Sequence, residues 1–180
     1  MNSATPRRVL CLCGSLRRVS SNRAALEAAW QLAPASLELH LYDGLATLPL
    51  FNPDDEQASL PASALALRAA VGQADALLIA CPEYAHGVPG AFKNLLDWLV
   101  GDQAFPGKPV LLLNASARDS HHAQEALAEI LRTMSARLLA SQPFPVALPG
   151  AGCTAEQVLA NPARCAELRA ALDCLASELV

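Results

Sequence analysis

The sequence predicts a doubly wound α/β domain in which a five-stranded parallel sheet lies between two layers of helices. Three short runs, at residues 9–13, 76–81 and 110–113, are apolar without alternation, which is typical of strands buried on both faces of a parallel sheet. Helical patterns separate these runs, without internal repeats or low-complexity linkers. This alternation of strand and helix indicates three layers.

Two further strands are expected. Residues 37–41 alternate apolar and polar side chains, which predicts a strand at the edge of the sheet with one face in water. The fifth strand is expected within about residues 138–146, where Pro143 and Pro145 disfavour a regular central strand.

Five helices are expected between and after the strands. Ser21 or Asn22 is expected to cap the first helix, which stops before Pro34. Apolar side chains three and four residues apart, or flanking prolines and glycines, predict the other four. These helices are expected at residues 61–73, 89–101, 127–134 and 168–179.

Composition and charge indicate one globular domain over residues 1–180. Hydrophobic residues make up 53% and charged residues 17% of the chain, so a single core-rich domain is expected. The net charge is −4 and the basic residues are scattered, which disfavours nucleic-acid binding. No apolar run approaches the ~18 residues of a membrane span, and no signal peptide is visible. We therefore expect a cytoplasmic protein that does not bind membranes.

The six cysteines contain no CxxC pair, and their density is too low for a disulfide scaffold. Cys11 and Cys13 share one face of the first strand. Because small buried thiols are common in cores, we interpret them as packing residues rather than as a redox pair.

The loop after the first strand, residues 14–23, is rich in hydrogen-bond donors and lacks both the GxGxxG and the P-loop motifs. A helix N-terminus favours anions, and Ser, Asn and Arg side chains add donors. Two interpretations are open, a site for a terminal phosphate monoester or a capped helix with solvated arginines. The position of the loop at the carboxyl end of a strand favours phosphate.

A second motif follows the third strand. PEYxxGxPGxxKNxxDW spans residues 82–98, and GSLRxxSxN spans residues 14–22. Together, these motifs resemble the NAD(P)H-dependent FMN reductase family, a group with a flavodoxin-like fold that includes quinone, chromate and azo-dye reductases. The resemblance covers about residues 9–135.

The resemblance implies FMN as the cofactor and NADPH or NADH as the co-substrate. The residues that it assigns to the FMN phosphate are Ser15, Arg17, Ser20 and Asn22. The residues that it assigns to the loop along the isoalloxazine ring are Pro82, Glu83, Tyr84, His86 and Gly87. We count Ser116, after the fourth strand, with the cofactor-binding residues.

The implied reaction passes a hydride from NAD(P)H to FMN and then electrons to a small-molecule acceptor, such as a quinone, chromate, an azo compound or free flavin. The flavin supplies the reactive centre, so no catalytic side chain and no metal are expected. The resemblance also implies a homodimer or tetramer, with the helix that carries Trp98 as a candidate contact. Alternatives are a non-enzymatic flavin-binding electron carrier or sensor, and a family member that has lost the flavin.

Two features depart from the family pattern. Ala85 stands where the family commonly has Asn, which predicts a missing polar contact near the flavin. Residues 114–124 are bulky where the family has a small, glycine-rich loop. Adjacent histidines on a helix diverge by about 100°, so His121 and His122 are interpreted as solvated helix-start residues or as groups at the mouth of the site, and not as metal ligands.

Overall fold

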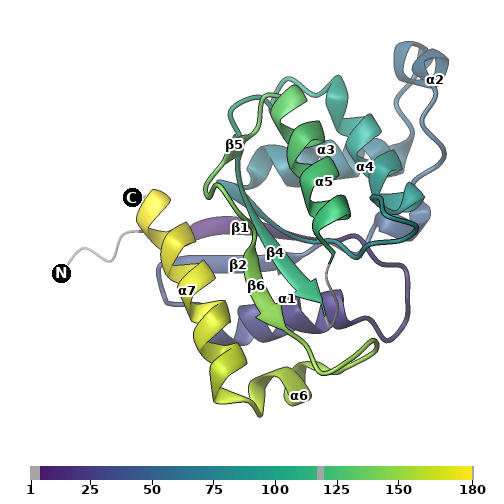
Figure 1. The fold of residues 1–180 in the computed structure, drawn as a ribbon. Helices are drawn as coiled ribbons and strands as arrows, with labels where there is room; N and C mark the ends of the chain where they lie inside the picture. Colours follow the sequence, from purple (N-terminus) through teal and green to yellow (C-terminus); the bar gives the residue numbers. More distant parts are fainter. Residues whose placement is uncertain (1–4, 117–119, 180) are drawn as a thin grey trace.

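The computed structural model describes residues 5–116 and 120–179, and it has the predicted three layers (Figure 1). The parallel sheet has the order β2-β1-β3-β4-β5, and β6 also pairs with β4. This is the order of a flavodoxin-like sheet, with its switch point between β1 and β3. The strands are β1 (Arg7–Cys13), β2 (Leu37–Leu41), β3 (Ala76–Ala80), β4 (Pro109–Ser116), β5 (Arg137–Leu138) and β6 (Phe144–Ala147).

The predicted fifth strand is present as two short pieces on the same edge. Strand β5 pairs with the start of β4, and β6 pairs with the end of β4. Pro145 lies within β6 opposite Asn114. An edge strand tolerates proline because one side of its backbone makes no ladder bond, and this explains why the strand forms despite its prolines.

The helices divide between the two faces of the sheet. Helices α1, α6 and α7 pack in one hydrophobic core with the side chains of Val9, Cys11 and Cys13, whereas α3, α4 and α5 pack in the other with Leu10 and Leu12. Figure 1 shows these two groups on opposite sides of the strands. The helices are α1 (Ser21–Leu32), α2 (Pro53–Ala58), α3 (Ala62–Gln73), α4 (Gly90–Val100), α5 (His121–Thr133), α6 (Ala155–Leu159), α7 (Pro162–Glu178) and the 3-10 turn η1 (Leu45–Thr47).

The structure corrects several helix boundaries. The N-cap of α1 is Ser20, whose hydroxyl accepts from the backbone N–H of Arg23, rather than Ser21 or Asn22. Helix α5 begins at His121, which agrees with the interpretation of His121 and His122 as helix-start residues, although its apolar pattern begins only at residue 127. Helix α7 begins six residues before its apolar pattern at residue 168, because its first turn carries polar residues. The short helices α2, α6 and η1 were not predicted. None of the helices in the described ranges is both long enough and apolar enough to cross a membrane.

Asn94 and Trp98 attach the loop after β2 to α4. The Asn94 side chain accepts from Phe51 N at 2.7 Å and donates to Pro49 O at 2.8 Å. The Trp98 indole donates to Pro49 O at 2.9 Å and packs edge-on against the Phe51 ring. Trp98 is fully buried within the chain, so its own side chain packs inside the domain, and a subunit contact through the helix that carries it stays a prediction.

We predict that stability falls in alkaline solution because thiols are buried. Burial raises the pKa of Cys11 to about 12 and also raises the pKa of Cys13 and Cys81. Unfolded thiols ionise near pH 8.5, so the stability that the buried, protonated thiols contribute to the fold is fully present below that pH. It is lost as the pH rises above it, by up to about 1.4 kcal/mol per pH unit for each thiol.

Urea unfolding with reductant present, at pH values from 7 to about 11, measures this decline. Cys11→Ala removes one of the buried thiols and should give a shallower decline than the wild-type protein. Equal slopes for the two proteins would contradict the assignment to Cys11.

Candidate functional site

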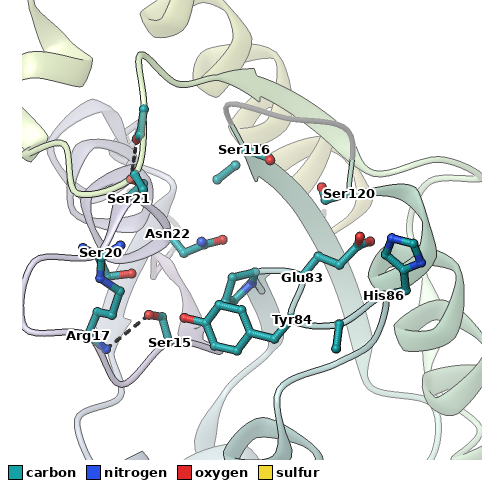
Figure 2. Close-up of a pocket in the computed structure, with 15 residues that line it drawn as sticks. Ser15, Arg17, Ser20, Ser21, Asn22, Glu83, Tyr84, His86, Ser116 and Ser120 are labelled. Carbon is teal, nitrogen blue, oxygen red and sulfur yellow. Dashed lines mark hydrogen bonds between the residues drawn. The ribbon is translucent and has the colours of Figure 1, made fainter.

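A cavity of about 670 Å³ opens at the carboxyl ends of β1, β3 and β4. In Figure 2, side chains from the start of α1 stand on one side of it, and those from the loop after β3 stand on the other. Doubly wound proteins bind their ligands at this place. The cavity is lined by Ser15, Arg17, Ser20, Ser21, Asn22, Pro82, Glu83, Tyr84, Ala85, His86, Ala115, Ser116, Ser120, Gly150 and Ala151.

The structure brings the two sequence motifs together around this cavity. Every predicted cofactor-binding residue except Gly87 lines it. Sequence reasoning missed the contributions of Ser21, Ser120 and the segment Gly150–Ala151. Ser21 begins α1 and Ser120 immediately precedes α5, and this position at a helix start could have indicated both as site residues. The proline-rich stretch before Gly150 gave no such indication.

The wall formed by the start of α1 offers several donors. Arg17 lines the cavity, and its guanidinium forms no ion pair within the described ranges. Arg23, by contrast, is paired with Glu27 and Asp43. Not all of the arginines in the loop of residues 14–23 can therefore offer their charge to a ligand. The first turn of the helix adds its own unpaired amides, and this end of the cavity therefore suits an anion.

Asn22 provides an independent sign of a missing ligand. It is buried, with 7% of its surface exposed, and its Oδ1 makes no hydrogen bond to the part of the chain that the structure describes. A buried polar atom without a partner costs about 1–3 kcal/mol. Because Asn22 lines the cavity, a ligand with hydroxyl donors, such as a ribityl chain, can satisfy it, and FMN fits this requirement.

Strands β1 and β3 approach each other closely where the loops that flank the cavity begin. Gly14 N donates to Ala80 O at 2.9 Å and extends the pairing of β1 with β3. A Cβ at Gly14 would lie 2.7 Å from Cys81 Sγ and 3.1 Å from Cys81 Cα. Only glycine therefore allows the loops after β1 and β3 to begin side by side.

The opposite wall is a tight turn from Tyr84 to Gly87. The backbone of Tyr84 and Gly87 exchanges two hydrogen bonds of 3.1 Å, and the central residues Ala85 and His86 have φ of 50° and 59°. Positive φ at both central positions is typical of a type I′ turn, which favours Asn or Gly. At position 85 the chain therefore holds Ala in a backbone conformation that suits Asn or Gly, and the missing polar contact near the flavin stays a prediction.

Glu83 joins the two loops that flank this wall. Its carboxylate accepts from Ala123 N, in the first turn of α5, at 2.9 Å. Gln124 donates from its side chain to Cys81 O at 3.3 Å. Glu83 thus lines the cavity and also caps α5, so its carboxylate is partly used in holding the structure.

The histidines form a column beside the turn. The rings of His86 and His122 stack with centroids 4.4 Å apart, and His121 packs on His122 at 3.9 Å. Only His86 of these three lines the cavity. His121 and His122 are exposed, so they bear on the mouth of the site through His86. The neighbouring residues 117–119 of the predicted bulky loop lie outside the described ranges.

The fold and this cavity define a class of protein, a doubly wound α/β protein with a ligand-binding crevice at the carboxyl ends of its strands. The comparisons make this class specific. Residues 7–147 match the family model of NADPH-dependent FMN reductase. The chain is 38% identical to a quinone reductase of Escherichia coli, over 66% of this chain and 68% of that protein.

Other relatives agree. The chain is 38% identical to an NAD(P)H-dependent FMN reductase of Pseudomonas aeruginosa, over 67% of this chain and 69% of that protein. A flavoenzyme NAD(P)H:(acceptor) oxidoreductase from Paracoccus denitrificans superposes with a TM-score of 0.81 at 26% identity, over 96% of this chain and 97% of that one. The chain belongs to the NADPH-dependent FMN reductase family.

We predict that Ala85→Gly stabilises the protein. A non-glycine residue in the left-handed region costs about 1–2 kcal/mol, and glycine relieves this cost. Part of the gain in stability is offset by the greater entropy of glycine in the unfolded chain. The expected net gain is about 0.5–1 kcal/mol, measured by urea unfolding of the flavin-free protein.

Ala170→Gly is the matched control. Ala170 is exposed in the middle of α7, where glycine is unfavourable, so this variant should lose about 1 kcal/mol. A loss of similar size in both variants would show that Ala85 is not strained.

Proposed function

We propose that this protein is an FMN-dependent oxidoreductase that takes a hydride from NADPH or NADH and reduces a small-molecule acceptor, with quinones as the first class to examine. The observation that carries the proposal is the cavity itself. It joins a donor-rich helix N-terminus, suited to phosphate, to a rigid turn at the far wall. Its shape and polarity match a molecule with a phosphate at one end and a planar ring at the other.

The residues divide by their place in the cavity. We propose that Arg17 and Ser15 bind the phosphate, with the amides of the first turn of α1. Ser20 combines this role with its capping bond to Arg23 N. The orphaned side chain of Asn22 faces the ribityl chain.

The turn after β3 positions the ring. Pro82 and the hydrogen-bonded backbone of Tyr84 and Gly87 hold the loop in one conformation beside the cavity. His86 lies at the edge of the cavity. When bound, the flavin supplies the hydride-accepting centre. The protein orients it, and no side-chain nucleophile or metal is required.

Two finer features complete the proposal. We propose a homodimer or tetramer, as the family resemblance implies, with α4, the helix that carries the buried Trp98, as a candidate contact. We also propose a cytoplasmic location. All six cysteines are free, which suits a reducing compartment.

Steady-state kinetics test the function. Because the donor and the acceptor use one flavin in turn, reciprocal plots against NADPH at several quinone concentrations should be parallel, as in a ping-pong exchange. Intersecting lines would indicate that both substrates are bound together. A colourless purified protein that also fails to bind added FMN would instead favour a family member that has lost the flavin.

We predict that Arg17→Ala weakens FMN binding about 10- to 150-fold. A charged hydrogen bond contributes about 1.5–3 kcal/mol, and Arg17 forms no ion pair within the described ranges that the fold would lose. Fluorescence titration of the flavin-free protein measures the affinity, and thermal unfolding should be unchanged.

Arg18→Ala is the matched control. Arg18 is the next residue and is exposed, but it lines a separate groove and not the cavity. We expect it to leave FMN affinity nearly unchanged. Equal losses in the two variants would point to general electrostatic attraction in place of a specific phosphate contact.

A further inference from the structure

The segment that follows β6 forms a wall of the cavity that the family match does not include. The matched region ends at residue 147, yet Gly150 and Ala151 line the cavity together with Arg17 and Asn22. These residues lie about 130 positions from the start of α1 in the chain. A specific contact must therefore hold the two parts together.

Ser21 supplies that contact. Its hydroxyl donates to Gly150 O at 2.8 Å and accepts from Gly152 N at 2.7 Å and from Cys153 N at 3.4 Å. A serine hydroxyl has one proton to donate and two lone pairs, so this group is fully used. It has no proton left for a phosphate, and Ser21 is a different kind of residue from its neighbour Ser20.

The two serines at the start of α1 thus have separate roles. Ser20 caps the helix, and Ser21 reaches out of it to the segment after β6. Figure 2 shows this bond above the start of α1, at the same side of the cavity as Arg17. The capping bond remains when the Ser21 hydroxyl is removed, so the two roles can be separated by mutation.

The segment is anchored at both ends. Leu148 is buried and its N–H donates to Ser116 O at 3.3 Å. Cys153 is buried and precedes α6, whose start is fixed by a capping box of Thr154 and Gln157. Only residues 149–152 remain between these anchors, and Ser21 binds the middle of this short segment.

The segment also approaches the cationic group of the site. A Cβ at Gly152 would lie 3.7 Å from Arg17 Nη2 and 3.7 Å from Val19 O. Gly152 has φ of +86°, a conformation that other residues adopt at a cost. The backbone is thus bent so that it lies beside Arg17.

We propose that residues 149–152 form a cover over the phosphate end of the cavity, and that Ser21 is the positioning residue that holds this cover in place. The inference rests on the proposed function, since it assumes that FMN binds here. A covered phosphate loses contact with water, which strengthens its hydrogen bonds to Arg17 and to the α1 amides. The cover should therefore slow the release of FMN and favour FMN over riboflavin, which has the same ring but no phosphate.

The test compares FMN and riboflavin on the same flavin-free protein. Ser21→Ala should raise the dissociation constant of FMN about tenfold, and speed its release, while the constant for riboflavin changes less than about twofold. Flavin fluorescence measures both. Ser177→Ala is the control, because it removes a serine hydroxyl that donates one internal hydrogen bond on α7, away from the cavity. It should change neither constant.

A second variant reaches the cover from the other side. Gly152→Ala leaves the Ser21 hydroxyl in place but strains the segment at its positive φ, next to the N–H that Ser21 accepts, and it should give the same selective loss of FMN. Thermal unfolding of each flavin-free variant shows whether that variant folds. If Ser21→Ala does not fold, the comparison of FMN with riboflavin is made on Gly152→Ala.

The outcomes are distinct. Equal weakening of FMN and riboflavin, or no change in either, in a folded variant would overturn the cover. Failure of the wild-type protein to bind FMN would overturn the proposed function, and this inference with it. A loss confined to FMN, seen in a folded variant and absent from Ser177→Ala, supports the cover.

Discussion

Strands β1 and β3 lie side by side in the sheet, and the helices that follow them leave on opposite faces, α1 on one and α4 on the other. Their connecting loops must therefore diverge, and the crevice between them is the cavity. This divergence begins at Gly14, where the chains are so close that a Cβ would meet the backbone of Cys81. The whole site depends on that one contact without a side chain, because both loops start from it.

Once the crevice exists, the start of α1 decides what it binds. A helix N-terminus presents unpaired amides and a partial positive charge, and Arg17, which forms no ion pair with the residues that the structure describes, adds a charged side chain to the cavity. Arg23, in the first turn of α1, is neutralised by Glu27 and Asp43. Arg17 therefore supplies the unpaired positive charge that lines the cavity, which suits this end of the site to an anion.

The fold class and most of the site could be predicted from the sequence because both depend on local patterns. Buried parallel strands are continuous apolar runs, and the donors of the first loop are adjacent in the chain. The cover after β6 could not be predicted, because Ser21 and Gly150 meet only through the tertiary fold. The left-handed conformation at position 85 could not be predicted for a related reason: a sequence shows which side chain is present at a position, but not the φ angle of its backbone.

The turn after β3 is supported by the start of α5. Ala85 and His86 hold left-handed conformations, each costing about 1–2 kcal/mol. The imidazole of His86 stacks on that of His122, with ring centroids 4.4 Å apart. Glu83 and Gln124 add hydrogen bonds between the same two loops. Because these contacts flank Ala85 in the chain, the start of α5 helps to hold the turn in its strained conformation.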